Sequence, residues 1–263
     1  MTSRQRPSFP ARLDGSLAVV RATPTAPDLA TTVTGSKAAA ASPRSHGVGL
    51  DSQTVRMSMV SKLAAQGITD ARVLAAMGKI ERHRFVDSAL VNQAYEDTSL
   101  PIGLGQTISK PGVVSRMAEL LLGGRPGKIG RVLEIGTGCG YQAAVLSLLA
   151  TEVYSIERLR GLHEKARDNL RPMRLPNVHL LFGDGMAGFA KGAPYAGIVA
   201  AAGGEAVPQA WTDQLAVGGR LVAPVAASGR SQQALMVIDK TAQGLQQTVL
   251  EAVHFVPLKS GIA

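Results

Sequence analysis

The sequence has one cysteine, few aromatic residues and no long apolar run. Cys139 is the only cysteine among 263 residues, which excludes an intramolecular disulfide and fits a reducing compartment. No stretch approaches the ~18 apolar residues that a membrane-spanning helix needs. The N-terminus lacks the apolar core of a secretory signal. These features lead us to expect a cytoplasmic protein with no membrane association.

The chain also lacks a dense basic segment, although its formal net charge is +9. Residues 1–50 contain six basic and two acidic residues, and the rest of the chain contains 22 basic and 17 acidic residues. Aromatic residues make up only 4% of the chain. Nucleic-acid-binding proteins usually show a basic stripe or aromatic side chains that stack on bases. We therefore expect no nucleic-acid partner.

Residues 1–50 are rich in Ala, Ser, Thr, Pro and Arg and show little apolar periodicity. Such a segment cannot bury enough apolar surface to offset the entropy that it would lose on ordering. We interpret it as a disordered tail. An organelle transit peptide is the alternative, because such peptides are also poor in acidic residues and carry scattered Arg.

The first ordered part, residues 51–124, predicts two helices, a long loop and a third helix. The segments "SQTVRMSMVSKLAAQG" and "TDARVLAAMGKI" both space their apolar residues for a helix, and Thr69 is the predicted N-cap of the second. The loop at 98–109 ends at Ser109, which we predict to be the N-cap of the third helix, with Pro111 in its first turn. Long ordered loops are often functional.

Residues 125–263 alternate between strand and helix patterns. The predicted strands are 131–135, 152–156, 178–182, 196–201, 219–224, 233–239 and 248–256, and the predicted helices are 140–149, 159–170 and 206–216. This alternation implies a mostly parallel sheet covered on both faces. The short "KTAQG" between the last two strands predicts an antiparallel hairpin at one edge. The expected fold class is α/β and Rossmann-like, with an N-terminal helical extension.

The stretch "RVLEIGTGCGYQAAVL" joins a predicted strand to a predicted helix through closely spaced glycines. Gly136, Gly138 and Gly140 allow the backbone to turn tightly and to approach a ligand at the carboxyl end of the strand. A dinucleotide site has the pattern G-x-G-x-x-G, but Tyr141 stands at the third glycine position. Glu134, the acid before the glycines, would repel a pyrophosphate and suits a cofactor that carries an ammonium group. The pattern is typical of S-adenosylmethionine-dependent methyltransferases.

Two further acids follow the next two predicted strands. Glu157 ends "VYSIE", 21 residues after Gly136, where a carboxylate can accept hydrogen bonds from ribose hydroxyls. Asp184, in "FGDG", is placed to accept a hydrogen bond from an adenine amino group. The ordered set of acids and glycines predicts S-adenosylmethionine as the cofactor. We interpret Cys139, in the glycine stretch, as a small packing residue.

The motifs "HRFV", "AYEDTSLPIGLGQTIS", "RVLEIGTGCGYQAAVL", "VYSIER", "GDG", "GGRLVAPV" and "VHFVPL" follow one another along the chain. Together they closely resemble the protein-L-isoaspartate O-methyltransferase family over about residues 53–263. The most specific element is "GQTIS" with "LEIGTGCGYQ" some 28 residues on. The resemblance implies methyl transfer from S-adenosylmethionine to the α-carboxylate of isoaspartyl residues in damaged proteins. The ester then collapses to a succinimide, which can reopen as normal aspartate.

The resemblance also implies roles for individual residues. Ser109 matches the active-site serine. The predicted cofactor-binding residues are Gln106, Thr107 and Ile108 beside it, Glu134, Gly136, Thr137, Gly138 and Gly140 in the glycine loop, Glu157 at the ribose, and Asp184 and Gly185 at the adenine. The chain departs from the family at Gly112, where some members have a histidine or an aromatic residue. It also departs at Gly203-Gly204, where many members have a single small residue and Pro.

No catalytic base and no metal ion are expected. A carboxylate with a pKa near ~4 is already ionised at neutral pH, so a hydroxyl group that orients it is sufficient. The five histidines show no metal-ligand spacing. We expect a monomer that acts on damaged proteins and peptides. The alternatives are a small-molecule O-methyltransferase on the same fold and a catalytically silent cofactor-binding module.

Overall fold

The computed structural model describes residues 53–226 and 232–263. The tail predicted at residues 1–50 lies outside the described residues. The α-helices are α1 (Gln53–Ala65), α2 (Ala71–Lys79), α3 (Pro111–Leu122), α4 (Tyr141–Leu149), α5 (Arg160–Leu170) and α6 (Gln209–Gln214). The strands are β1 (Leu100–Gly103), β2 (Gln106–Ile108), β3 (Ile129–Ile135), β4 (Ala150–Glu157), β5 (Val178–Phe182), β6 (Tyr195–Ala200), β7 (Leu215–Ala226), β8 (Gln233–Thr241) and β9 (Gly244–Val253). Short 3₁₀ helices are η1 (Arg82–Phe85), η2 (Ser88–Gln93), η3 (Arg171–Met173), η4 (Gly185–Ala187) and η5 (Ala190–Gly192).

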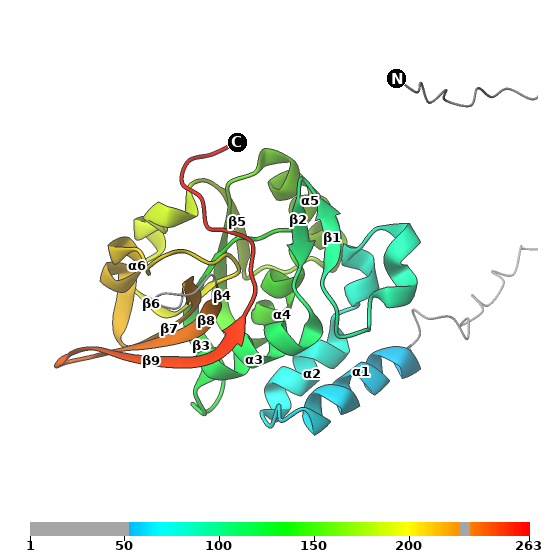
Figure 1. Cartoon of the computed structure of the whole chain (residues 1–263), viewed down its shortest axis with the longest axis horizontal. Coiled ribbons are helices and arrows are strands. Elements are labelled where there is room, and N and C mark those ends of the chain that lie inside the picture. Colours follow the sequence, from blue (N-terminus) through cyan, green and yellow to red (C-terminus); the bar gives the residue numbers. More distant parts are fainter. Residues whose placement is uncertain (1–52, 227–231) are drawn as a thin grey trace, which may run out of the picture. The chain divides into compact units, whose positions relative to one another are not determined.

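The main sheet has the strand order β5-β4-β3-β6-β7-β8-β9 (Figure 1). Strands β3 to β7 are paired in parallel, whereas β8 pairs antiparallel with β7 and β9 pairs antiparallel with β8. The chain passes to one side of β3 for β4 and β5 and to the other side for β6 and β7. This reversal makes the carboxyl end of β3 the place where an α/β sheet binds ligands. The predicted α/β fold with an antiparallel edge hairpin is confirmed.

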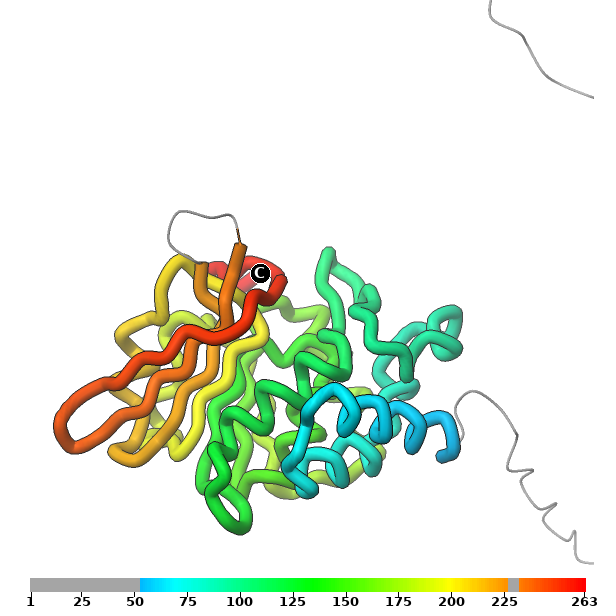
Figure 2. Tube along the Cα trace, turned by 60° about the horizontal axis from the view of Figure 1, so that its bottom comes forward, coloured from blue at the N-terminus to red at the C-terminus, as the bar shows by residue number. Residues whose placement is uncertain are grey.

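Helices cover both faces of the parallel strands. Val132, Val153 and Val199 belong to the core that α3, α4 and α5 bury on one face. Leu133 and Ile198, one residue along from two of these, belong to the core on the other face, where α6 packs. The switch between faces follows from the two-residue period of a strand. Helices α1 and α2 pack outside this layer, on α3 and α4 (Figures 1 and 2).

The predicted N-cap of the second helix is wrong by one residue. Asp70 is the N-cap of α2, and its side chain accepts the backbone N–H of Arg72 at 2.9 Å. Thr69 instead donates its hydroxyl to Glu119 of α3, and its backbone N–H donates to the same carboxylate. Thr69 therefore binds a carboxylate that is distant in the sequence and does not cap α2.

Several predicted element boundaries also change, and strand β7 begins at Leu215, four residues before its predicted start. The segment 98–109, predicted as a loop, contains the β1–β2 hairpin. The helix predicted at 206–216 is limited to Gln209–Gln214, because β7 already begins at Leu215. Strand β9 begins at Gly244, four residues before the predicted start, and its first six residues are exposed. Backbone hydrogen bonds to β8 extend β9 here. Because the side chains of this part are exposed, the sequence carries no apolar alternation that would predict it.

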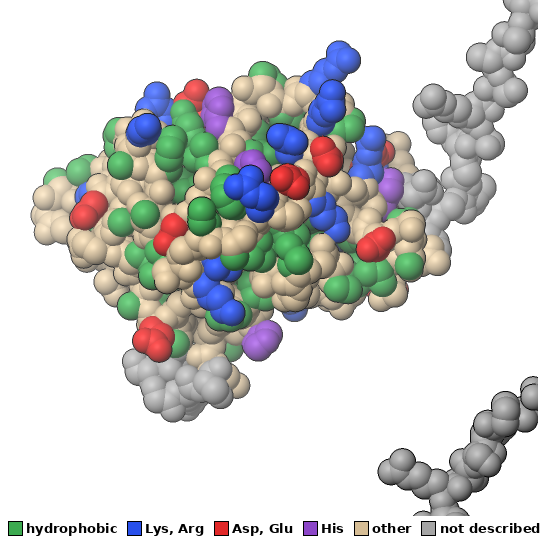
Figure 3. All heavy atoms as spheres, turned by 90° about the horizontal axis from the view of Figure 1, so that it is seen from above, with side chains coloured by type: hydrophobic (Ala, Val, Ile, Leu, Met, Phe, Trp, Pro, Cys, Tyr) green, Lys and Arg blue, Asp and Glu red, His purple; other side chains and the backbone are tan. Residues whose placement is uncertain are grey.

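After β9 the chain runs back across the carboxyl ends of the parallel strands (Figures 1 and 2). Pro257 forms an isolated bridge with Gly203, which follows β6. The backbone N–H of Ala263 donates to the carbonyl of Arg158, which follows β4. On the face drawn in Figure 3, basic side chains are intermixed with acidic and apolar ones. Within residues 53–226 and 232–263, no helix is long and apolar enough to cross a membrane.

Candidate active site

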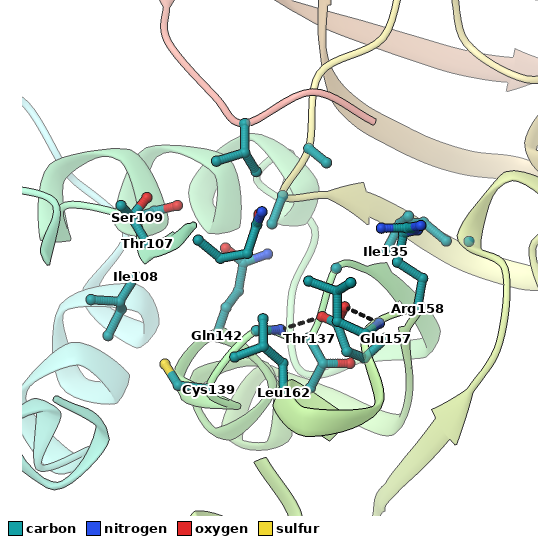
Figure 4. A pocket seen from close by; sticks show the side chains of 18 of the residues that line it. Thr107, Ile108, Ser109, Ile135, Thr137, Cys139, Gln142, Glu157, Arg158 and Leu162 are labelled. Carbon is teal, nitrogen blue, oxygen red and sulfur yellow. Dashed lines mark hydrogen bonds between the residues drawn. The ribbon is translucent and has the colours of Figure 1, made fainter. Parts of the chain in front are cut away.

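A cavity of about 450 Å³ lies at the carboxyl ends of β3 and β4. This volume falls within the roughly 300–1,000 Å³ that is usual for small-molecule sites. Four segments supply its walls: the β1–β2 hairpin, the glycine turn after β3, the end of β4 with the start of α5, and the C-terminal segment. Ser109 and Glu157 stand on opposite sides of the cavity (Figure 4).

The backbone N–H groups of the glycine turn donate hydrogen bonds to the neighbouring strand β4, those of Gly136 and Thr137 to the carbonyl of Ile156 and that of Gly138 to a side chain. Gly138 has φ +56°, and its N–H donates to Glu157 Oε2 at 2.8 Å. A Cβ atom on Gly138 would lie 3.2 Å from Cδ1 of Ile102 in β1. Both the positive φ and the close approach of the hairpin therefore favour glycine at this position.

Glu157 is buried, with 5% of its surface exposed, and both of its oxygens are engaged by backbone N–H groups. Oε2 accepts from Gly138, and Oε1 accepts from Leu159 at 2.9 Å. An ionised carboxylate offers about four acceptor positions. Two of them remain free for the hydroxyl groups of a bound ribose, so Glu157 fits a nucleoside cofactor.

Glu134 is fully buried behind the glycine turn and does not line the cavity. Ser155 donates its hydroxyl to Glu134 Oε2, and Ser155 Oγ lies 2.6 Å from Thr137 Oγ1, which does line the cavity. Burial raises the pKa of Glu134 to about 8, with a smaller contribution from the negative charge of Glu157. The carboxyl group is therefore connected to the cavity through two hydroxyl groups.

Asp184 does not line the cavity, but its neighbour Gly185 does. Asp184 Oδ1 accepts the N–H of Met186 at 2.8 Å, which caps η4. Oδ2 accepts the N–H of Gly261 in the C-terminal segment at 2.7 Å. Each oxygen keeps a second acceptor position, so a further donor can still reach this carboxylate.

Ser109 lies between β2 and α3 and is half-buried at the cavity wall. The prediction that it is the N-cap of α3 is wrong, because Lys110 occupies that position. The backbone N–H of Gly112 is instead capped by Asp97, whose Oδ1 accepts it at 2.6 Å. Among the described residues, no side-chain hydrogen bond involves Ser109, so its hydroxyl faces the cavity without a partner.

Most of the residues predicted to form the site line the cavity. The predicted residues that line it are Gln106, Thr107, Ile108, Ser109, Gly136, Thr137, Gly138, Glu157 and Gly185. Glu134, Gly140 and Asp184 lie outside its lining. Gly140 is instead the N-cap of α4 with φ +90°, and a Cβ atom there would lie 3.0 Å from Cδ1 of Leu170 in α5. Close packing of two helices therefore explains this glycine.

A second hollow of about 850 Å³ adjoins the cavity. The two share Thr107, Ser109, Ala201 and Val256 in their walls. We call this hollow, which lies between α3 and the end of β9, the α3–β9 groove. Its charged side chains form ion pairs, Arg116 with Glu251 at 2.8 Å and Lys110 with Asp97 at 3.7 Å.

Sequence reasoning missed a buried cation beside the site. Arg82 of η1 has no exposed surface, and its guanidinium lies 4.9 Å from the ring centroid of Tyr141 in the cavity wall. Its Nη2 donates to the carbonyl of Thr98 at 3.3 Å. Arg82 therefore joins the start of the hairpin segment to α4. Its flanking residues, "ERHRF", carry no sign of burial, so the sequence pattern could not indicate this role.

Cys139 is buried in the cavity wall, and burial raises the pKa of its thiol above the usual range. A neutral buried thiol is a packing group, as predicted from the sequence. Within residues 53–226 and 232–263, no group of three or more His, Cys, Asp or Glu side chains is placed to hold a metal ion.

Comparison with known proteins gives one consistent family. Residues 54–263 match the model of the family "Protein-L-isoaspartate(D-aspartate) O-methyltransferase (PCMT)". A protein-L-isoaspartate O-methyltransferase of Methylibium petroleiphilum is 62% identical over 217 residues, which cover 82% of this chain and 81% of the relative.

Solved structures agree in fold. A protein-L-isoaspartate O-methyltransferase is similar with a TM-score of 0.71 and 28% identity, over 79% of this chain and 67% of the other. A Plasmodium falciparum beta-aspartate methyltransferase, solved with S-adenosyl-L-homocysteine, is similar with a TM-score of 0.65 and 23% identity, over 78% of this chain and 98% of the other. The match over 54–263 and the 62% identity establish that this chain belongs to the protein-L-isoaspartate(D-aspartate) O-methyltransferase family.

Proposed function

We propose that the cavity holds S-adenosylmethionine and that Ser109 orients the isoaspartyl carboxylate against it. The family assignment makes the chain an S-adenosylmethionine-dependent protein-L-isoaspartate O-methyltransferase. The roles of individual residues are our proposal. The observation that carries it is the position of the Ser109 hydroxyl, which has no hydrogen-bond partner among the described residues and stands in the wall shared by the cavity and the groove.

Glu157 would accept the ribose hydroxyls with the two acceptor positions that Gly138 and Leu159 leave free. Asp184 and Gly185 would meet the adenine, because Gly185 lines the cavity and each oxygen of the neighbouring Asp184 keeps an acceptor position for an amino group. Glu134 would act from behind the turn by fixing Thr137 through Ser155. Bound S-adenosylmethionine supplies a methyl group activated by its sulfonium sulfur.

For this reaction the protein mainly has to position the carboxylate and the methyl group. The accepting carboxylate is ionised at neutral pH, so no residue has to remove a proton. Ser109 would donate a hydrogen bond to one carboxylate oxygen and leave the other in line with the methyl group. Ile108, Val114 and Ile135 give the cavity apolar walls. With cofactor and substrate bound, these walls would keep water from the reacting groups and so strengthen such hydrogen bonds.

The α3–β9 groove is where we place the substrate chain. Its walls combine Ser99 and Thr107 of the hairpin segment, Ala201 after β6, and His254 and Phe255 after β9. An isoaspartyl residue and an aspartyl residue both present a carboxylate, and they differ in where the main chain leaves it. Discrimination between the two residues would therefore depend on how these segments bind the main chain of the substrate beside Ser109.

The test is methyl transfer to a short isoaspartyl peptide and to the identical peptide with normal aspartate. We expect efficient transfer to the first and almost none to the second. Equal rates on both would contradict the proposal, and transfer only to free small acids would indicate the small-molecule alternative. Binding of S-adenosyl-L-homocysteine without any transfer would indicate a silent cofactor-binding module.

We further propose that residues 51–263 form the methyltransferase domain, with a helical and active-site loop part to residue 124 and a cofactor-binding α/β part from residue 125. The family model, which matches from residue 54, supports this boundary. A monomer in the cytoplasm remains our expectation. The free, buried Cys139 supports the reducing compartment and has no bearing on the oligomeric state.

A further inference from the structure

The tip of the β1–β2 hairpin combines two unfavourable features in one residue. Leu104 has φ +52°, in the left-handed region that side chains with a Cβ atom avoid. Its side chain is also 62% exposed, which is unusual for a large apolar group in an ordered turn. Neither feature stabilises the fold.

The turn itself favours a different residue. Gly103 pairs with Gln106, so Leu104 and Gly105 form a two-residue connection, and both have positive φ. Positive φ at both central positions is the mark of a type I′ turn, in which Asn-Gly is strongly preferred. Leucine at the first position is therefore a costly choice. Strain of this kind is usually retained where it serves a function.

The place of Leu104 indicates what that function is. The hairpin lies beside α5, where Lys165 donates to the carbonyl of Ile102 at 2.8 Å (Figure 1). A Cβ atom added to Gly161, in the first turn of α5, would lie 3.1 Å from Cδ1 of Leu104. The leucine thus reaches from the hairpin to the start of α5, and it lines the cavity beside Leu159 and Leu162.

We propose that Leu104 is a cofactor-contacting residue, whose exposed apolar side chain closes over S-adenosylmethionine where the hairpin meets α5. The inference rests on the function proposed above. Leu104 belongs to the wall of the cavity and not to the wall of the α3–β9 groove, so it faces the cofactor and not the peptide. Binding would bury apolar surface that is exposed in the unbound protein, and this gain would offset the strained turn.

The chain offers a matched control for the strain. Arg174, the C-cap of η3, is the other non-glycine residue with positive φ among the described residues, at +48°. It is exposed and does not line the cavity. Replacing either residue by Asn relieves a similar backbone strain, because Asn tolerates the left-handed region. Only Leu104→Asn also removes apolar surface from the cavity.

The experiment measures melting temperature without ligand and the Kd of S-adenosyl-L-homocysteine by calorimetry, for the full chain and three variants. We expect Leu104→Asn to melt at the same temperature or roughly 1–4 °C higher. Its Kd should rise roughly five- to tenfold, as expected for losing part of a leucine contact. Leu104→Met, which keeps an apolar side chain, should stay within about twofold of the parent Kd. Arg174→Asn should gain similar stability with an unchanged Kd.

An unchanged Kd in Leu104→Asn would overturn the inference. A lowered melting temperature in the same variant would also overturn it, because Leu104 would then be a structural residue. An equal loss of affinity in Arg174→Asn would show that binding depends on turn geometry in general. If the unchanged chain failed to bind S-adenosyl-L-homocysteine, the proposed function itself would fall. That outcome is distinct from the failure of this inference.

Discussion

Asp97 caps helix α3 from outside it. Its Oδ1 accepts the backbone N–H of Gly112 at 2.6 Å, across fifteen residues of chain that include the β1–β2 hairpin. A Cβ atom on Gly112 would lie 2.9 Å from the same oxygen, so a larger residue here would require the Asp97 carboxylate to shift. Because Asp97 serves the helix, the hydroxyl of Ser109 does not have to.

Removing this cap should destabilise the protein. Asp97→Ala leaves the Gly112 N–H unpaired and should cost about 0.5–2 kcal/mol of unfolding free energy. Asp97→Asn should retain most of the stability, because Asn caps as well as Asp. Denaturant unfolding of both variants measures the difference. Equal losses in the two would mean that the ion pair with Lys110, and not the cap, is what matters.

Glu157 should affect both stability and cofactor affinity. In Glu157→Gln an amide NH₂ group replaces one carboxylate oxygen and faces the N–H of either Gly138 or Leu159. That N–H then loses its acceptor, which should cost about 1–3 kcal/mol of unfolding free energy. Affinity for S-adenosyl-L-homocysteine should fall by a similar free energy, since ribose hydroxyls lose an acceptor.

The matched control for Glu157 is Glu152, at the other end of β4. It is partly exposed and paired with Arg131, so Glu152→Gln should change stability by less than ~1 kcal/mol and leave affinity unchanged. Calorimetry and thermal melting on both variants make the comparison. An unaltered Kd in Glu157→Gln would remove this residue from the cofactor site.

Glu134 should make stability depend on pH between about 4.5 and 8. Its pKa is raised from the ordinary 4.5 to about 8 in the folded protein, so over this range the unfolded chain ionises and the folded protein does not. The stability from neutral Glu134 is fully present below pH 4.5 and is lost as pH rises through 8, by up to about 1.4 kcal/mol per pH unit.

The side chain in Glu134→Gln does not titrate, so this variant lacks the pH dependence that Glu134 contributes. The difference in unfolding free energy between the variant and the parent should grow in favour of the variant from pH 5 to pH 8 and then level off. Denaturant titrations at several pH values test this. A difference that stays constant with pH would mean that the pKa of Glu134 is not raised.

Residues 1–50 should be dispensable. They precede the segment that matches the family model, which starts at residue 54. A chain that begins at residue 51 should keep its melting temperature within a few degrees and its turnover nearly intact. A larger fall in either quantity would assign the tail a role in the catalytic unit.

The sequence was most informative where local patterns decide the structure. Alternating apolar strands and helices predicted the sheet, and the glycines after β3 predicted the turn that meets Glu157. These features depend on spacing within a few residues. Their positions in the sheet then follow from connection rules that hold across α/β folds.

What the sequence concealed depends on contacts between distant segments. Ser109 has the residue type of an N-cap, yet Lys110 holds the N-cap position and Asp97, from across the hairpin, accepts the N–H of Gly112. Nothing in the sequence indicates that Glu157 is buried, or that the backbone N–H groups of Gly138 and Leu159 donate to its two oxygens. In the sequence Leu104 is a leucine in a glycine-rich loop, and neither its positive φ nor its exposure can be predicted from that pattern.

The central claim concerns the hydroxyl of Ser109. Because it caps nothing, Ser109→Ala should keep the parent melting temperature within about a degree and the parent affinity for S-adenosyl-L-homocysteine within about twofold. Ser61→Ala, at an exposed serine of α1, is the control for the substitution itself. The measurement is the single-turnover rate of methyl transfer to a saturating isoaspartyl peptide. We predict that Ser109→Ala lowers it roughly 100-fold, as a misplaced carboxylate would. A rate close to that of the parent would contradict the account.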